Sequence, residues 1–290
     1  MTLVPGRRTG RSTASYLRAQ KMRRQRQFAG GADVPISPTR IGLLPGDIDP
    51  AQPVNRGLVW CLGAHPAASP LLGRDLIGRQ PVTLDATADL TSVHPDQALW
   101  RSLAINAAGD QASWASAKLR TITNQVTIAV HASVTAGAAD AILLVISWID
   151  DAWTTPFYTL GLRADGVVAS TTDAAFQFTD GTTLFEAINS AGTAWNADSN
   201  DHWIVATRNG TTARIYFDGV KQGADLTVSG NAQGFNTSGS RLITLGRGPD
   251  AGQRLSDADY HSASIWQREL SAAEVAELAA NSTVQFIGGS

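Results

Sequence analysis

Two tight-turn signals in tandem constrain the fold of this chain more than any other feature. Residues 202–223 read HWIVATRNGTTARIYFDGVKQG, in which Asn209-Gly210 and Asp218-Gly219 interrupt runs of β-branched and aromatic residues. Asn, Asp and Gly tolerate the positive φ that a two-residue hairpin turn requires. The segment therefore predicts a strand over 202–208 that turns at Asn209-Gly210 into a second strand over 213–217.

Hydrophobic periodicity predicts further strands from about residue 57 onward. Residues 126–132 alternate apolar and polar side chains, which is the pattern of a half-buried strand. In the strand over 202–208, the same period places Ile204 and Ala206 opposite to Trp203 and Val205. Residues 141–148 form a continuous apolar run, which is typical of an inner strand.

Three more strand signals complete the β pattern. Asp165-Gly166 separates residues 157–163 from 167–170 and predicts another two-residue hairpin. Residues 242–245 predict a strand closed by Gly246, and residues 263–266 predict the last strand.

One helix is predicted near the C-terminal end. Ser271 and Glu274 have the spacing of a capping box, and Leu270 and Val275 occupy the positions of a hydrophobic staple. Asn281 can end the helix. Many short strands separated by turn residues, followed by a single late helix, predict an all-β fold of the sandwich type.

Charge is divided unevenly along the chain. Residues 1–32 hold eight basic side chains and no acid, which leaves 15 basic and 25 acidic residues after them, a net of −10. We expect an N-terminal arm and Pro/Gly-containing linker over residues 1–53 and a β-sandwich domain over 54–290. The arm residues expected to dock on a partner are Arg7, Arg8, Arg11, Tyr16, Leu17, Arg18, Lys21, Arg23, Arg24, Arg26 and Phe28.

Several motifs of the predicted sandwich resemble those of phage-encoded LamG-like proteins. They are NRGLVWCLGA at 55–64, DLIG at 75–78, VTL at 82–84, the hairpin at 202–223, LITLGRG at 242–248 and SIWQRELSAAEVAELAAN at 264–281. The resemblance covers residues 55–283 and implies the concanavalin A-like jelly-roll fold. One departure is Asp257-Ala258-Asp259-Tyr260-His261, where the family usually has a Gly-rich turn. A family ligand site near that turn therefore does not carry over.

Glutamate usage argues against an enzyme. Jelly-roll glucanases place two Glu on one strand as nucleophile and acid/base, whereas this chain has only four, Glu186, Glu269, Glu274 and Glu277. Three of these flank or occupy the predicted helix, where capping and solvation explain them. We expect no catalytic residues, and a polysaccharide-degrading enzyme is the third alternative considered.

Eight tryptophans give candidates for sugar stacking. Trp60, Trp148, Trp203 and Trp266 lie in predicted strands and are expected in the core. The remaining four lie nearer predicted loops, where an exposed indole could stack on a sugar ring, although core or rim packing is the preferred explanation for each of them, because aromatic side chains carry much of a core's buried area. These four are Trp100, Trp114, Trp153 and Trp195.

Asp-rich segments give candidates for calcium, which binds carboxylate and carbonyl oxygens. The alternative is a solvated turn, in which Asp and Asn bond to their own backbone. The candidates are Asp150, Asp151, Asp198, Asp201, Asp257 and Asp259. No other cofactor is expected, and the single cysteine, Cys61, can form neither an intrachain disulfide nor a cysteine-based metal site.

These features together predict a surface protein of a bacteriophage particle, either a capsid decoration, a head fibre or a minor tail component. No apolar run suggests a membrane span or a signal peptide, so we expect synthesis in the host cytoplasm and a place on the virion surface. The arm is expected to dock on an acidic protein surface rather than nucleic acid, within a homo-oligomeric or symmetric assembly. The alternative is a carbohydrate-binding lectin that holds a host-surface glycan.

Overall fold

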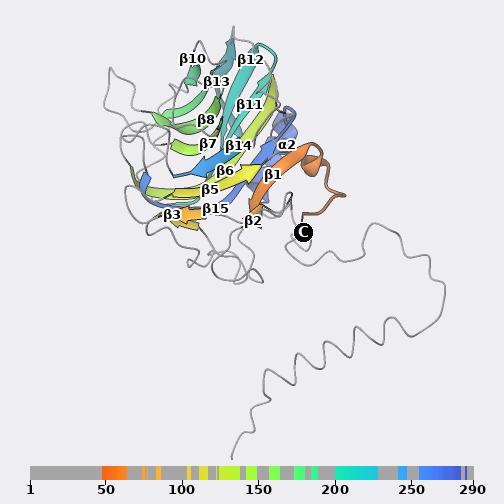
Figure 1. Ribbon diagram of the computed structural model, residues 1–290. Helices are drawn as coiled ribbons and strands as arrows, with labels where there is room; N and C mark the ends of the chain where they lie inside the picture. Colours follow the sequence, from red (N-terminus) through yellow and green to blue (C-terminus); the bar gives the residue numbers. More distant parts are fainter. Residues whose placement is uncertain are drawn as a thin grey trace, which may run out of the picture. The chain divides into compact units, whose positions relative to one another are not determined.

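The protein is described here by a computed structural model in which two antiparallel sheets pack face to face (Figure 1). It describes residues 48–63, 74–75, 77, 83–85, 103–105, 111–116, 122, 124–137, 142–148, 157–163, 173–179, 184–188, 200–227, 241–246, 255–281 and 285. The predicted all-β sandwich with one short C-terminal helix is confirmed.

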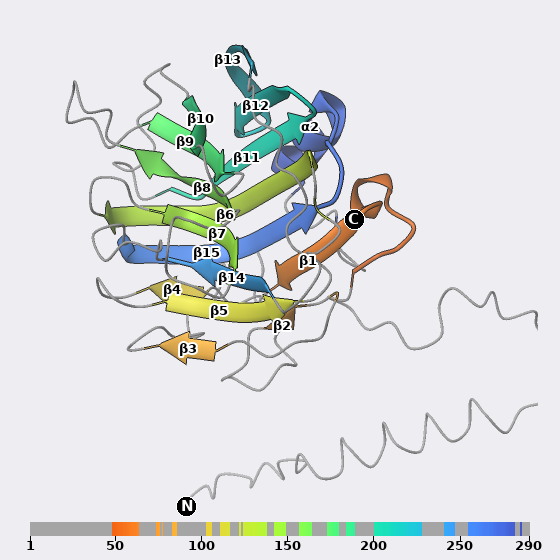
Figure 2. The same cartoon turned by 45° about the horizontal axis from the view of Figure 1, so that its top comes forward.

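The first layer is an eight-stranded sheet in the order β13-β12-β11-β6-β15-β1-β2, with β4 paired to β15 as well. The long strands β6 and β15 run beside each other through its middle (Figure 2). The strands are β1 (Leu58–Gly63), β2 (Arg74–Asp75), β4 (Leu103–Ile105), β6 (Gln125–Gly137), β11 (His202–Asn209), β12 (Thr212–Phe217), β13 (Val220–Thr227) and β15 (Leu255–Trp266).

The second layer is a seven-stranded sheet in the order β10-β9-β8-β7-β14-β5-β3. The apolar run predicted as an inner strand becomes β7, which lies between β8 and β14. The strands are β3 (Thr83–Asp85), β5 (Gln111–Ser116), β7 (Ile142–Trp148), β8 (Phe157–Arg163), β9 (Asp173–Thr179), β10 (Leu184–Ile188) and β14 (Arg241–Leu245).

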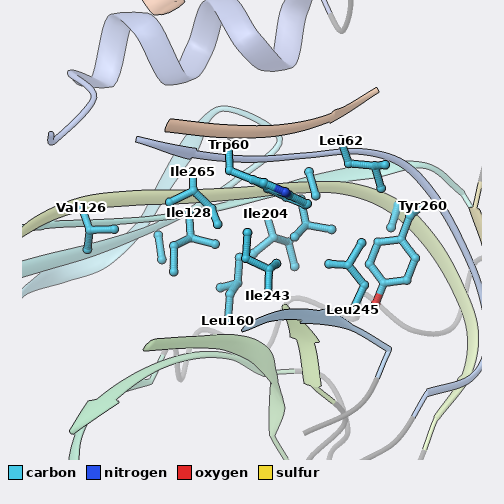
Figure 3. Packing of buried hydrophobic residues seen from close by; sticks show 14 of the residues in the cluster. Trp60, Leu62, Val126, Ile128, Leu160, Ile204, Ile243, Leu245, Tyr260 and Ile265 are labelled. Carbon is cyan, nitrogen blue, oxygen red and sulfur yellow. The ribbon is translucent and has the colours of Figure 1, made fainter. Parts of the chain in front are cut away.

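The main core fills the space between the two sheets. Figure 3 shows Trp60, Ile128, Ile204 and Ile265 pointing from the eight-stranded sheet toward Ile243 and other side chains of the opposite sheet. Interdigitation of the inner faces is what holds a β-sandwich together.

Tyr260 ties the two sheets by a polar contact inside this core. Its side chain is fully buried, and the backbone of Gly246, at the end of β14, hydrogen-bonds the hydroxyl. Burial raises the pKa of the Tyr260 hydroxyl, because the phenolate would lose its hydration.

The outer face of the eight-stranded sheet is buried as well. A second cluster packs there, with Ala129, Trp203, Val205 and Trp266 from the sheet against Leu278 of the helix α2 (Ala272–Ala280). The prediction that Ile204 and Ala206 face opposite to Trp203 and Val205 is confirmed, because the two pairs lie in different clusters.

The prediction that residues 126–132 form a half-buried strand is wrong. Thr127 and Ala129, on the outer face of β6, are as fully buried as Ile128 on the inner face. The alternation of apolar and polar residues shows which side chains share a face of the strand. It cannot show that a helix from a distant part of the sequence covers the face that carries Thr127 and Ala129.

The two tight turns of the tandem hairpin differ in type. Asp218-Gly219 forms a two-residue turn with positive φ at both positions, 46° and 80°, as type I′ requires. The first turn is shifted by one residue from the prediction, because Asn209 pairs with Thr212 and leaves Gly210-Thr211 as the loop. Only Gly210 has positive φ there, which is the pattern of type II′.

One more strand prediction lies outside the described residues and another needs correction. Arg163 at the end of β8 pairs with Asp173 of β9, and both the turn predicted at Asp165-Gly166 and the strand predicted over 167–170 lie outside the described residues. The last strand begins at Leu255 and not at residue 263, because Ala258 and Tyr260 extend its core-facing pattern.

A short segment before β1 closes the outer face. Pro53–Asn55 is a 3-10 helix (η1) in which Val54 is fully buried, and the Val54 carbonyl accepts a 2.7 Å hydrogen bond from the Trp266 indole. The Asp49 amide donates to the carbonyl of Gln285 at 2.9 Å. Asp49 and Pro53, which were predicted to lie in the linker, therefore hydrogen-bond to residues of the sandwich domain.

Arg268 joins this segment to the helix. Its guanidinium donates to the carbonyls of Pro53 and Arg56 and to both carboxylate oxygens of Glu274, at 2.6 and 3.0 Å. The predicted capping box of Ser271 and Glu274 is confirmed. The Glu274 carboxylate therefore serves both the cap and the ion pair.

Glycine at position 219 should matter more for stability than glycine at position 210. Both have positive φ, which costs an L-residue about 1–2 kcal/mol. A Cβ at Gly219 would also lie 3.1 Å from the backbone of Ala276, whereas one at Gly210 meets nothing within 4 Å. We expect Gly219→Ala to lower the free energy of unfolding more than Gly210→Ala in denaturant titration. Equal losses would contradict the packing of α2 on this turn.

Glu274 should make stability depend on acidity. The Arg268 guanidinium, helped by Ser271, lowers the pKa of Glu274 to about 2 from a usual 4.5. Its contribution is therefore complete above pH 4.5 and is lost as the pH falls toward 2. Glu274→Gln keeps a side chain that can complete the capping box but removes the charge that pairs with Arg268. It should therefore cost about 0.2–1 kcal/mol at neutral pH, the range for a partly exposed ion pair, and should flatten this acid dependence. Glu277→Gln, on the exposed side of the same helix, is the control and should leave both unchanged.

Candidate functional site

The candidate residues for sugar stacking are only partly within the described residues. Trp114 lies in β5, is 1% exposed, and contacts Trp60 edge to face at 5.3 Å between ring centroids. A stacking role for Trp114 is therefore wrong: its side chain points into the main core, as Ala112 two residues earlier also does. Trp100, Trp153 and Trp195 lie outside the described residues, and their stacking role stays a prediction.

Three of the four tryptophans expected in the core are buried as predicted. Trp60 and Trp266 are fully buried and Trp203 is 3% exposed. Trp148 belongs to β7, and the burial of its side chain stays a prediction. Trp60 faces the opposite sheet, whereas Trp203 and Trp266 pack on the outer face under α2.

The candidate calcium ligands do not assemble into a site among the residues that the structure describes. Asp257 and Asp259 belong to β15 and not to a turn, and no group of three or more His, Cys, Asp or Glu side chains within the described ranges could hold a metal ion. Asp150, Asp151 and Asp198 lie outside these ranges, as do all the docking residues of the arm.

Asp201 instead contacts a histidine. Its Oδ1 lies 2.7 Å from Nε2 of His261, and the His261 ring lies 5.2 Å from that of His131. His131 in turn stacks on Trp203, with ring centroids 4.9 Å apart and planes 2° from parallel. We call these four residues the histidine cluster.

A bulge in β15 creates the histidine cluster. The pairing register with β6 shifts between Tyr260 and Ser262, so that His261 and Ser262 both leave the main core. His131 and His261 are only 6% and 8% exposed, which leaves little imidazole surface for a ligand. The contact between Asp201 and His261 connects the residue just before β11 to β15. We interpret the cluster as structural.

The Asp of the Tyr-x-Asp-Gly motif is also structural. Asp218 Oδ1 accepts a 2.9 Å hydrogen bond from the backbone N–H of Trp203, and Oδ2 lies 2.7 Å from Nδ1 of His202. The side chain thus ties the type I′ turn to the first residues of β11. The motif that carries the family resemblance specifies a turn and not a ligand.

Three of the four glutamates have contacts or positions that the fold explains. Glu269 forms an ion pair with Arg214 and accepts a 2.9 Å hydrogen bond from Asn209. Glu274 caps α2, and Glu277 is exposed on the same helix. Glu186 lies in β10 opposite Gln177 of β9. Among the described strands, none carries two glutamates.

The family follows from the sequence match. A model of the concanavalin A-like lectin/glucanases superfamily matches residues 106–276. The chain belongs to this superfamily. No curated protein sequence matches it significantly. Within the described residues, no helix is long and apolar enough to span a membrane.

Solved structures share the fold at low identity. Domain 4 of AbnA, an extracellular arabinanase of family GH43 from Geobacillus stearothermophilus, solved in complex with arabinotriose, is 11% identical with a TM-score of 0.55. The match covers 77% of this chain and 98% of that domain. The botulinum neurotoxin serotype D/C binding domain is 11% identical with a TM-score of 0.57, covering 80% of this chain and 53% of that one.

A second neurotoxin structure agrees with these. The binding domain of botulinum neurotoxin DC in complex with rat synaptotagmin II is 10% identical with a TM-score of 0.56, covering 80% of this chain and 52% of that one. This chain therefore spans about half the length of either neurotoxin domain.

Replacing Trp114 tests its placement in the core. Trp114→Ala should lower the free energy of unfolding by about 3–5 kcal/mol, the range for deleting a large buried aromatic side chain. Trp114→Phe should cost much less, because the phenyl ring keeps most of the buried area. The measurement is denaturant unfolding of both variants. If Trp114→Ala left stability unchanged, the side chain would lie at the surface and the stacking role would be open again.

Proposed function

We propose that this chain is a non-catalytic surface protein of a bacteriophage particle, in which the arm anchors the chain and the sandwich holds a host-surface glycan. The observation that carries the proposal is the separation of charge: residues 1–32 hold eight basic side chains and no acid, and the remainder has a net charge of −10. A basic arm on an acidic body suits attachment to an acidic protein surface, because complementary charge steers and orients docking.

The glycan part of the proposal is supported by the fold. The chain belongs to a lectin-containing superfamily, and a domain of which it covers 98% was solved with arabinotriose bound. Both faces of the eight-stranded sheet are occupied at its centre. The sugar is therefore expected at loops, where Trp100, Trp153 and Trp195 could stack on it.

The contacts and positions of the glutamates support the proposal that the chain is not catalytic. Retaining and inverting glycosidases need two carboxyl groups facing one sugar. Glu269 and Glu274 are each held by an arginine, and Glu277 lies on the exposed side of α2. We propose that the chain binds polysaccharide without cleaving it.

A place on the virion surface completes the proposal. The chain is made in the host cytoplasm and joins other capsid or tail proteins in a symmetric assembly, without contacting a membrane or nucleic acid. An arm that becomes ordered on docking can cover a large partner surface. Mass spectrometry of purified particles released by cells that carry the gene tests this location. Peptides of the chain are expected in the particles, and their presence only in the cell fraction would contradict it.

A glycan array probed with the full chain tests the binding. We expect retention of a defined set of glycans, and loss of it in at least one of Trp100→Ala, Trp153→Ala and Trp195→Ala without a change in thermal unfolding. Reducing-sugar release from the bound polysaccharide should stay at background. Release of reducing sugar that depends on one carboxylate of this chain would contradict the proposal that the chain is not catalytic. An array on which no glycan is retained would contradict glycan binding.

Removing the arm should separate folding from attachment. Deletion of residues 1–43 should give a folded sandwich that no longer joins the particle, because residues 44–290 form a compact unit of their own. Changing Arg18, Lys21, Arg23, Arg24 and Arg26 to Gln should weaken attachment, and so should added salt, since exposed charges are screened beyond about 8 Å at physiological ionic strength. The readout is the copy number per particle.

Two results would count against this division of labour. If the truncated chain joined particles fully, the anchor would lie on the sandwich. If attachment resisted salt and the charge changes but failed in a Tyr16→Ala, Leu17→Ala, Phe28→Ala variant, apolar contacts and not charge would hold the arm.

A further inference from the structure

The edge strand β13 is unlike the other edge strands that the structure describes. β2, β3, β4 and β10 are two to five residues long, whereas β13 has eight residues, six of them exposed. It also carries Val220, which at 64% is the one exposed large hydrophobic side chain found among the described residues. A long exposed edge offers unpaired backbone groups to a strand of another molecule.

The middle of β13 is not a regular strand. Gln222 pairs with Ile215 and Leu226 pairs with Ala213, so that three residues of β13 lie opposite Arg214 alone. Gly223 begins this bulge with φ of 63°, a left-handed conformation that strands do not use. The bulge interrupts the row of backbone groups that an incoming strand would need.

Ion pairs hold the bulge in place. Asp225, within the bulge, accepts hydrogen bonds from Arg214 Nε and Nη2 at 3.0 and 2.7 Å and from Lys221 Nζ at 2.6 Å. Arg214 is fixed in turn by Glu269, and Glu269 by Asn209 of β11. A network of several charges is more effective than one exposed pair. Arg214 and Lys221 also lower the pKa of Asp225 to about 2, so it stays charged throughout the physiological range.

We propose that the bulge of β13, clamped by Arg214, Lys221 and Asp225, closes this edge to strand addition and prevents copies of the chain from pairing edge to edge. The inference does not depend on the proposed function. It assigns a role to this exposed strand of the described sheet and explains why a long edge carries a left-handed glycine beside the ion pairs of Asp225 with Arg214 and Lys221.

Removing the bulge tests the proposal. Deletion of Ala224 and Asp225 leaves one residue opposite Arg214 and keeps Leu226 opposite Ala213, and Gly223→Thr then favours a regular strand. Analytical ultracentrifugation of the full chain should show a sedimentation coefficient that rises with concentration for this variant, relative to the unchanged chain, with its circular dichroism spectrum retained. A profile equal to that of the unchanged chain would overturn the proposal.

Two further variants separate edge pairing from loss of stability. Gly210→Thr also replaces an open, positive-φ glycine but leaves β13 intact, and it should not associate. Association of Gly210→Thr to the same extent would overturn the proposal, because destabilisation would then be the cause. If the deletion variant fails to fold, Asp225→Ser tests the proposal instead, because it removes the ion pairs of the bulge with one exposed substitution. This variant should associate measurably. A monomeric Asp225→Ser variant would overturn the proposal.

Discussion

Burial of both faces of the eight-stranded sheet is the constraint on which the rest of the structure depends. The inner face packs on the seven-stranded sheet, and the outer face, with Trp203, Val205 and Trp266, is as apolar as a second core. Such a surface exposed to water would cost on the order of 25 cal/mol per Å². The chain covers it with α2 and with the segment around Val54, and Arg268 ties these two covers together.

This double coverage limits where the molecule can bind a ligand. The centre of the sheet is occupied on both sides, and the side chains of the histidine cluster contact one another. Around the eight-stranded sheet, the loops and turns remain for recognition, and function concentrates in such segments on rigid β scaffolds. In the function proposed above, the charge of the arm would act separately from the sandwich.

Short sequence motifs correctly predicted the turns and helix ends that are specified by residues close together in the chain. Asp218-Gly219 specifies a type I′ turn through positive φ, and Ser271 with Glu274 specifies a helix start. The predictions failed where contacts with residues far away in the sequence determine the burial or the secondary structure of a residue. Trp114 was placed near a loop because the short strand β5 has a weak pattern, and Asp259 was assigned to a turn because charge masked the core-facing alternation of β15. Sequence spacing could not show the contact of Asp201 with His261, sixty residues away.

A cryo-electron microscopy map of the particle that contains this chain would show where the sandwich and the arm lie. We predict sandwich density that projects from the surface, with residues 1–32 running over an acidic protein beneath it and Trp100, Trp153 and Trp195 turned outward. A sandwich embedded in the shell, or basic residues of the arm following nucleic acid, would contradict the account.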